Sequence, residues 1–192
     1  MASIGIIGAD MASIGIIGDG PGGLSAALFL AKNGHQATVY GQDKTAMHFA
    51  HLHNYLGIPE ITGTEFQKVA REQVLSFGAV IVDEEVTAVS TGDAFTVSTA
   101  SGEATFDYLI LTEGKKPVVA RSLDLEVDEL GAIEVDRDSR SSMDRVYVVG
   151  RSARPARSQA IISAGAGAAA ALDILAAEAG KNVTDWDSPP PD

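Results

Sequence analysis

The sequence contains no cysteine among its 192 residues. This absence excludes disulfide scaffolds, thiolate metal sites, iron–sulfur clusters and a redox-active Cys-x-x-Cys pair within the chain. Basic residues are few: 14 lysines and arginines stand against 26 aspartates and glutamates, giving a net charge of −12. Non-specific nucleic-acid binding requires cationic side chains that neutralise phosphates, so we expect no nucleic-acid partner.

Long hydrophobic runs are also scarce. The longest apolar run is Ala-rich, lies near the C-terminus and is shorter than a convincing membrane span. No charged segment followed by an apolar segment and a cleavage site is present, so we expect a cytoplasmic protein with no membrane contact. Few aromatic residues and a large acidic excess are typical of proteins from salt-accumulating halophiles, although an ordinary acidic protein has the same balance.

The first ten residues are nearly repeated by the next ten. MASIGIIG occupies residues 1–8 and 11–18, but only the second copy continues into a glycine-rich turn. A solenoid needs longer units and several copies, so a start-site artefact is favoured over an added edge strand. We expect residues 1–10 to be an extension, 11–180 to be a single dinucleotide-binding domain, and 181–192 to be a polar tail.

The spacing of apolar residues predicts alternating strands and helices. Helices are expected at 21–33, 64–77 and 158–178, and strands at 14–17, 36–40, 79–82, 86–90, 94–98, 103–106, 108–111 and 145–149. Thr62 or Thr64 is expected to cap the second helix. This order predicts an α/β fold: a Rossmann-like domain with a parallel sheet, a β-meander crossover and flanking helices.

A glycine-rich loop joins the first strand to the first helix. Residues 18–23 read GDGPGG, a G-x-G-x-x-G pattern in the strand–helix setting that dinucleotide binding requires. Gly18 permits the tight turn, Gly20 lets the backbone approach a pyrophosphate, and Gly23 allows close helix packing. Pro21 suits the first helical turn, and the helix N-terminus presents free N–H groups to phosphates. A plain strand-to-helix turn is the alternative.

The second strand ends without the acid that usually holds an adenosine ribose. Its sequence is Val39-Tyr40-Gly41-Gln42-Asp43, so that acid is absent or displaced to Asp43. The departure counts against an NAD site in particular.

Three histidines stand close together, at His48, His51 and His53. A metal site would require their imidazoles to converge, and the nearby acids Asp43 and Glu60 are not at a signature spacing. We therefore expect partly exposed structural histidines and no metal site.

Four ordered segments resemble the flavin domain of the thioredoxin-reductase family. GDGPGGLSAALFLAKNG resembles its first strand–helix unit, and that family often has Gly after the second strand, as in Val39-Tyr40-Gly41. HNYLGIPEITGTEFQKVAREQVLSFGAVIVDEEVTAV resembles its Asn-Tyr-Pro-Gly stretch with the following helix and strand. FDYLILTEG (106–114) resembles the strand that ends in Ala-Thr-Gly. RVYVVGRSARPARSQAIISAGAGAAAALDIL (145–175) resembles the last strand and the helix whose N-terminus faces the flavin.

The resemblance implies FAD as the cofactor. Ser158 would cap the last helix, and the N–H groups of Gln159 and Ala160 would face the flavin carbonyl edge. No residue is identified as catalytic. The cofactor-binding residues expected from the loop and the resemblance are Gly18, Gly20, Pro21, Gly22, Gly23, Gly41, Gln42, His51, Asn54, Val86, Thr112, Glu113, Gly114, Gly150, Arg151, Ser158, Gln159 and Ala160.

Three departures from the family pattern affect its chemistry. The family's nicotinamide-nucleotide domain is replaced by residues 115–145, where GAIEV (131–135) is expected to form one short strand. The Cys-x-x-Cys is missing with that domain. The family's Gly-Asp after the last strand, whose carboxylate bonds the ribityl chain, is Gly150-Arg151 here.

Arginine is a cationic donor and cannot accept the hydrogen bonds that the family's aspartate accepts. Arg151, Arg154 and Arg157 form a basic cluster in an acidic chain. Two interpretations stay open: an anion site for FAD phosphates or a second ligand, and a solvated loop whose arginines pair with surface acids.

These features predict a single-domain FAD-binding oxidoreductase whose flavin exchanges electrons with NAD(P)H, a redox partner protein or a small substrate. The alternative is a non-catalytic nucleotide-binding or protein-interaction module that has lost FAD. An NAD(P)-binding domain is a third hypothesis, which the absence of Arg after the second strand disfavours. The shortened segment 114–146 would expose surface that a homodimer re-covers.

Overall fold

The computed structural model describes residues 11–188, and the duplicated extension 1–10 lies outside that range. Its centre is a five-stranded, fully parallel sheet in the order β10-β9-β1-β2-β5. The strands are β1 (Ser13–Ile17), β2 (Gln36–Tyr40), β5 (Val80–Val82), β9 (Tyr108–Leu111) and β10 (Val146–Val148).

The central strands are apolar along their whole length because both faces of the sheet are covered. Every residue of β9 and β10 is buried. In β1, Ile16 pairs with Val39 on one side and Ile110 on the other, and all three are fully buried.

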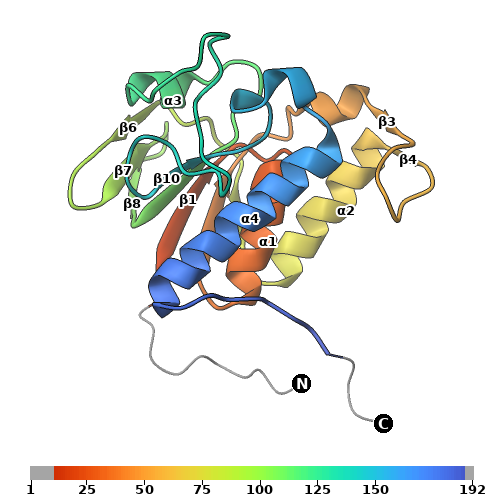
Figure 1. Cartoon of the computed structure of the whole chain (residues 1–192), viewed down its shortest axis with the longest axis horizontal. Helices are drawn as coiled ribbons and strands as arrows, with labels where there is room; N and C mark the ends of the chain where they lie inside the picture. The colour runs from red at the N-terminus through yellow and green to blue at the C-terminus, as the bar shows by residue number, and fades with distance from the viewer. Residues whose placement is uncertain (1–10, 189–192) are drawn as a thin grey trace.

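Three helices cover one face of the sheet: α1 (Pro21–Lys32), α2 (Gly63–Ser76) and α4 (Ala160–Ala179). Figure 1 shows them side by side, with α1 between α2 and α4. Ile14, Leu30 and Ile174 belong to the core between these helices and the sheet. This layer places the starts of α1 and α4 at the carboxyl edge of the strands.

An antiparallel meander covers the other face, formed by β6 (Ala88–Ser90), β7 (Phe95–Ser98) and β8 (Glu103–Phe106), with the short helix α3 (Val118–Ser122) beside it. Val97 and Leu111 belong to the second core, beneath the meander. The predicted α/β class, parallel sheet, meander and flanking helices are confirmed.

The remaining elements are short. β3 (His51–Leu52) and β4 (Ile61–Thr62) form a two-stranded antiparallel ribbon. Single 3-10 turns are η1 (Ala46–Phe49), η2 (Gly150–Ser152) and η3 (Pro155–Arg157).

Several predicted boundaries differ from the structure. Helix α4 begins at Ala160 with Gln159 as its N-cap residue, so the predicted cap at Ser158 is wrong: Ser158 instead ends the η3 turn. The strand predicted at 131–135 is also wrong, because that segment makes only the isolated bridge Val127–Ile133. The cap at Thr62 is confirmed, since its hydroxyl accepts a hydrogen bond from the N–H of Glu65 at 3.2 Å.

Helix α4 is long and apolar enough, by length and composition, to cross a membrane, which is more than the sequence pattern indicated. A helix that packs in a protein core passes the same test. Here α4 packs along α1, with Ala170, Ala171 and Ile174 fully buried.

Candidate functional site

The glycine loop follows β1 at the carboxyl edge of the sheet, and two of its glycines are sterically required. Gly18 has a φ of +111°, and a side chain there would overlap the carbonyl oxygen of Thr112. A side chain at Gly23 would overlap the carbonyl oxygen of Gly18. These contacts confirm the predicted tight turn and the close approach of α1 to β1.

Gly20 faces open space instead. It is the N-cap residue of α1 with an ordinary φ of −71°, and the nearest atom to an added Cβ would be Thr45 Oγ1 at 3.7 Å. The first turn of α1 carries no acidic side chain, and no side chain caps it. Its N–H groups and the positive end of its dipole are therefore available to an anion that approaches the Gly20 backbone.

The start of α4 lies against the start of α1. A side chain at Gly167 would overlap the carbonyl oxygen of Gly22, and a Cβ at Gly22 would lie 3.1 Å from the Ser163 carbonyl oxygen. Helix α4 likewise has no capping side chain and no acid in its first turn. The first turn of α1 thus lies against the first two turns of α4, and both helices direct the positive ends of their dipoles to this edge of the sheet.

Two predicted cofactor residues contact each other beside this edge. The Asn54 side-chain amide donates to Gln159 Oε1 at 3.0 Å. Asn54 follows the β3 strand and Gln159 precedes α4, so the bond joins the ribbon to the helix start. The sequence separates these residues widely, and the resemblance alone suggested their proximity.

Asp19 is a site residue that the sequence analysis missed. Its carboxylate is buried, accepts a hydrogen bond from the N–H of Asp43 at 2.9 Å and forms an ion pair with Arg71. A side chain at Gly41 would overlap this carboxylate, so the missing acid after β2 is replaced in space by the acid of the glycine loop. Burial raises the pKa of Asp19, and Arg71 opposes that rise.

The alternative position, Asp43, has another partner. Its carboxylate lies 3.1 Å from His48 Nε2, so it points to the histidine. Gln42, which lies between Gly41 and Asp43 in sequence, is half-buried, and its side chain accepts a hydrogen bond from Lys44 at 3.0 Å.

Gln67 supports the glycine loop from helix α2. It is fully buried, and its side-chain amide donates to the carbonyl oxygen of Asp19 at 2.6 Å. Its Oε1 atom has no hydrogen-bond partner within residues 11–188. No motif marks Gln67 or Arg71 in the sequence, because both act through long-range contacts from α2.

Two residues of the turn after β9, Glu113 and Gly114, have different roles. Glu113 accepts hydrogen bonds from the N–H groups of Val119 at 2.7 Å and Ala120 at 3.0 Å, so its carboxylate caps α3. Burial raises the pKa of Glu113, and these backbone bonds oppose the rise. Gly114 has a φ of +74° and nothing within 4 Å of an added Cβ, so this glycine leaves open space beside the turn.

The remaining predicted residues surround this edge or lie behind it. Gly150, with a φ of +71°, begins η2 directly after β10, and Arg151 follows it as an exposed side chain. No ion pair involves Arg151, Arg154 or Arg157 within the described part of the chain, which does not support pairing with surface acids. Val86 packs against the core beneath the meander.

The site is therefore a glycine-lined cradle: backbone at Gly20, Gly114 and Gly150 beside two helix N-termini. Its donor set of backbone N–H groups and Asn54 suits a phosphate-containing dinucleotide with a carbonyl-bearing ring. The open space at Gly20 and Gly114 is what such a ligand requires.

Comparison with known proteins gives the same family as the residues. The family described as pyridine nucleotide-disulphide oxidoreductase matches residues 12–117. A thioredoxin reductase from Streptomyces clavuligerus is 33% identical over 99 residues, which is 48% of this chain and 31% of that relative. The match thus spans about a third of that relative's length.

Solved structures share the fold at low identity. A thioredoxin reductase from Gloeobacter violaceus has a TM-score of 0.84 at 17% identity, covering 92% of this chain and 99% of that one. The atypical thioredoxin reductase TRi from Desulfovibrio vulgaris Hildenborough gives 0.80 at 18%, covering 88% and 99%. A ferredoxin-flavin thioredoxin reductase from Clostridium acetobutylicum gives 0.76 at 18%, covering 89% and 99%.

Proposed function

The chain belongs to the pyridine nucleotide-disulphide oxidoreductase family, and from that premise we propose that residues 11–180 form a single-domain FAD-binding oxidoreductase. The observation that carries the proposal is the meeting of two uncapped helix N-termini beside an open glycine cradle. Bound FAD would supply the two-electron chemistry, and the chain would supply position and electrostatics.

The chain's own residues have separable tasks in this proposal. The Gly20 backbone and the first turn of α1 hold the pyrophosphate, because no side chain obstructs the approach there. Asp19 occupies the space at the end of β2 from which a carboxylate reaches a ribose. The start of α4 favours negative charge on the flavin ring, and the Asn54–Gln159 bond fixes the ribbon beside it.

The electron donor is proposed to be external. The sequence has no cysteine, and residues 115–145 are too short for the family's nicotinamide domain. The relative from Clostridium acetobutylicum is named a ferredoxin-flavin thioredoxin reductase, which supports a protein donor as one route. Arg151, exposed directly after β10, would meet an anionic donor, either the phosphates of NAD(P)H or an acidic protein surface.

A visible absorption spectrum of the purified protein, taken before and after denaturation, tests this proposal. Flavin bands that release equimolar FAD would support it, and anaerobic bleaching by NADPH, NADH or reduced ferredoxin would identify the donor. A colourless protein that takes up no added FAD would overturn it. Salt-dependent binding of ADP or a partner by that colourless protein would instead favour a non-catalytic module, which the substitution of Arg151 for the family's aspartate motivates.

A further inference from the structure

The β3–β4 ribbon carries a cluster to which the proposed function gives no task, although its member His51 is among the residues that the sequence predicts to contact FAD. Its antiparallel register pairs His51 with Thr62 and Leu52 with Ile61. Continuing that register places His53 opposite Glu60. Successive side chains of a strand point to opposite faces, so His51, His53 and Glu60 share one face while Leu52 is buried on the other.

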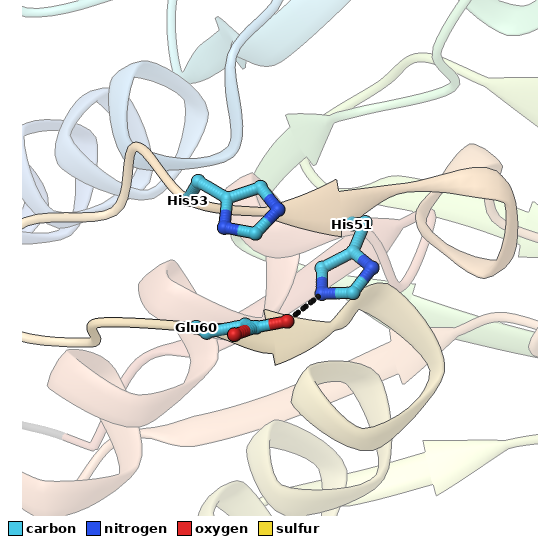
Figure 2. Close-up of side chains that lie close together, drawn as sticks. All are labelled: His51, His53 and Glu60. Atoms are coloured by element: carbon cyan, nitrogen blue, oxygen red, sulfur yellow. Dashed lines mark hydrogen bonds and ion pairs between the residues drawn. The ribbon is translucent and has the colours of Figure 1, made fainter.

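The three side chains already converge. His51 Nε2 lies 2.8 Å from Glu60 Oε1, and the His51 and His53 rings stack with centroids 4.6 Å apart at 10° (Figure 2). One candidate ligand atom from each residue lies within 4.8 Å of the others. The register of the β3–β4 ribbon by itself brings the three side chains together.

We propose that this face binds a divalent transition-metal ion, with Zn²⁺ as the preferred probe, through His51, His53 and Glu60. Two imidazoles and a carboxylate are ligands that Zn²⁺ accepts at about 2.0–2.2 Å, which places tetrahedral ligand atoms about 3.4 Å apart. The observed spacing is uneven, because His51 Nε2 and Glu60 Oε1 lie 2.8 Å apart while the ligand atoms of all three residues lie within 4.8 Å of one another. The side chains have room to adjust to an ion, since 52% of His51 and 62% of Glu60 is exposed.

The hydrogen bond between His51 and Glu60 marks the position of the ion. Nε2 of His51 and Oε1 of Glu60 face each other at 2.8 Å, and both atoms can coordinate one ion once the two side chains move apart to the spacing of zinc ligands. Binding requires a neutral imidazole and an ionised carboxylate, so any proton held between the two atoms is released to solvent. Three protein ligands leave at least one coordination position to water.

The ribbon is held in place on both sides of the cluster. Leu52 is buried against the protein, and Tyr55 contacts Phe66 of α2 with ring centroids 5.2 Å apart. A supported backbone reduces the ordering cost of metal binding.

The other histidines are engaged elsewhere, so they provide matched controls. His48 contacts Thr64 Oγ1 at 3.1 Å and Asp43, and His35 Nδ1 accepts from the N–H of Ala12 at 3.2 Å. His48 is near the cluster in sequence but does not belong to it. Within residues 11–188, His51 and His53 therefore converge and His48 stays apart from them.

Calorimetric titration of the chain with Zn²⁺, without an affinity tag and in a non-chelating buffer, tests the proposal. We expect saturable binding of equimolar Zn²⁺ and a rise in the thermal unfolding midpoint, because the ion binds only the folded ribbon. His53→Gln and Glu60→Gln should each weaken binding by at least about tenfold, since losing even an outer partner of a metal ligand costs that much. His48→Gln should leave the affinity unchanged.

Two results would overturn the site. One is the absence of saturable Zn²⁺ binding by the native chain. The other is unchanged affinity in the double variant His51→Gln/His53→Gln. Far-UV circular dichroism without metal establishes that each variant is folded. Repeating the titration with and without added FAD separates this site from the flavin proposal, because none of its three ligands belongs to the glycine loop.

Discussion

Individual glycines shape the candidate site for two different reasons. Gly18 and Gly23 avoid overlap with backbone, whereas Gly20 leaves space for a ligand. The sequence pattern predicted these three roles because a strand and a helix flank the loop. It could not predict the role of Gly41, because the group that excludes a side chain there is the Asp19 carboxylate, folded back from the loop.

Moving the carboxylate from residue 19 to residue 41 tests whether Asp19 takes the place of the acid that is missing after β2. Gly41→Asp should lower the free energy of unfolding by about 1–3 kcal/mol, because the new side chain overlaps Asp19. The double variant Asp19→Gly/Gly41→Asp should recover part of that loss, as measured by urea denaturation. If Gly41→Asp had the same free energy of unfolding as the native chain, residues 19 and 41 would not compete for the same space.

Asp107 predicts a specific acid sensitivity. The N–H and hydroxyl of Ser13 both donate to its carboxylate, at 2.8 and 2.7 Å, and these bonds hold its pKa below the ordinary value of 3.8. Because the folded pKa is depressed, the stabilisation is present above the ordinary pKa and is lost as pH falls through the folded pKa. The bonds also tie β1 to the start of β9.

We therefore expect Asp107→Asn to be less stable than the native chain at neutral pH, with the difference narrowing below pH 3.8. Urea denaturation at neutral pH and below pH 3.8 measures this difference in the free energy of unfolding. Asp144→Asn is the control, since 98% of that side chain is exposed. If the free energies of unfolding of the native chain and Asp107→Asn differed by the same amount at both pH values, the Ser13–Asp107 bonds would not cause the acid sensitivity.

At the scale of elements, apolar runs and helix signals predicted the sheet strands and the three long helices. The missed elements are short: β3 and β4 have two residues each, too few to show a period. The start of α4 was misplaced because Ser158 is a good capping residue by type, but its φ of −80° and ψ of 72° belong to the preceding turn. The strand order β10-β9-β1-β2-β5 arises from long-range pairing, which local sequence patterns do not encode.

The contact between α1 and α4 gives a matched pair of helix variants. Gly167→Ala should destabilise the chain by about 1–3 kcal/mol, because the added methyl overlaps the Gly22 carbonyl and separates the two helix starts. Gly165→Ala, on the same helix with nothing within 4 Å, should instead stabilise it by up to about 1 kcal/mol. Thermal unfolding of both variants measures the contrast, and equal effects would mean that the helices do not meet closely at Gly167.

At the scale of the whole molecule, large apolar side chains remain exposed beyond β9. Val118 is 69% exposed, Val127 51% and Leu130 84%, and all three lie in the segment between β9 and β10. Such a surface favours association, and we propose a homodimer that covers it. Light scattering should give twice the mass of one chain for the native protein. The variant Leu130→Glu should instead give the mass of a single chain. A monomeric native chain at several salt concentrations would contradict this proposal.

Equilibrium dialysis against FAD measures whether the glycine cradle holds this cofactor. Gly20→Ala adds a methyl where the protein has space and φ is ordinary, so the fold should persist while the pyrophosphate is obstructed. Gly92→Ala, in the β6–β7 turn with its nearest contact at 3.6 Å, is the matched control. We predict equimolar FAD on the native chain and the control, and at least about tenfold weaker binding, ~1.4 kcal/mol, for Gly20→Ala. Equal FAD affinity in all three proteins would place the cofactor elsewhere and contradict the account.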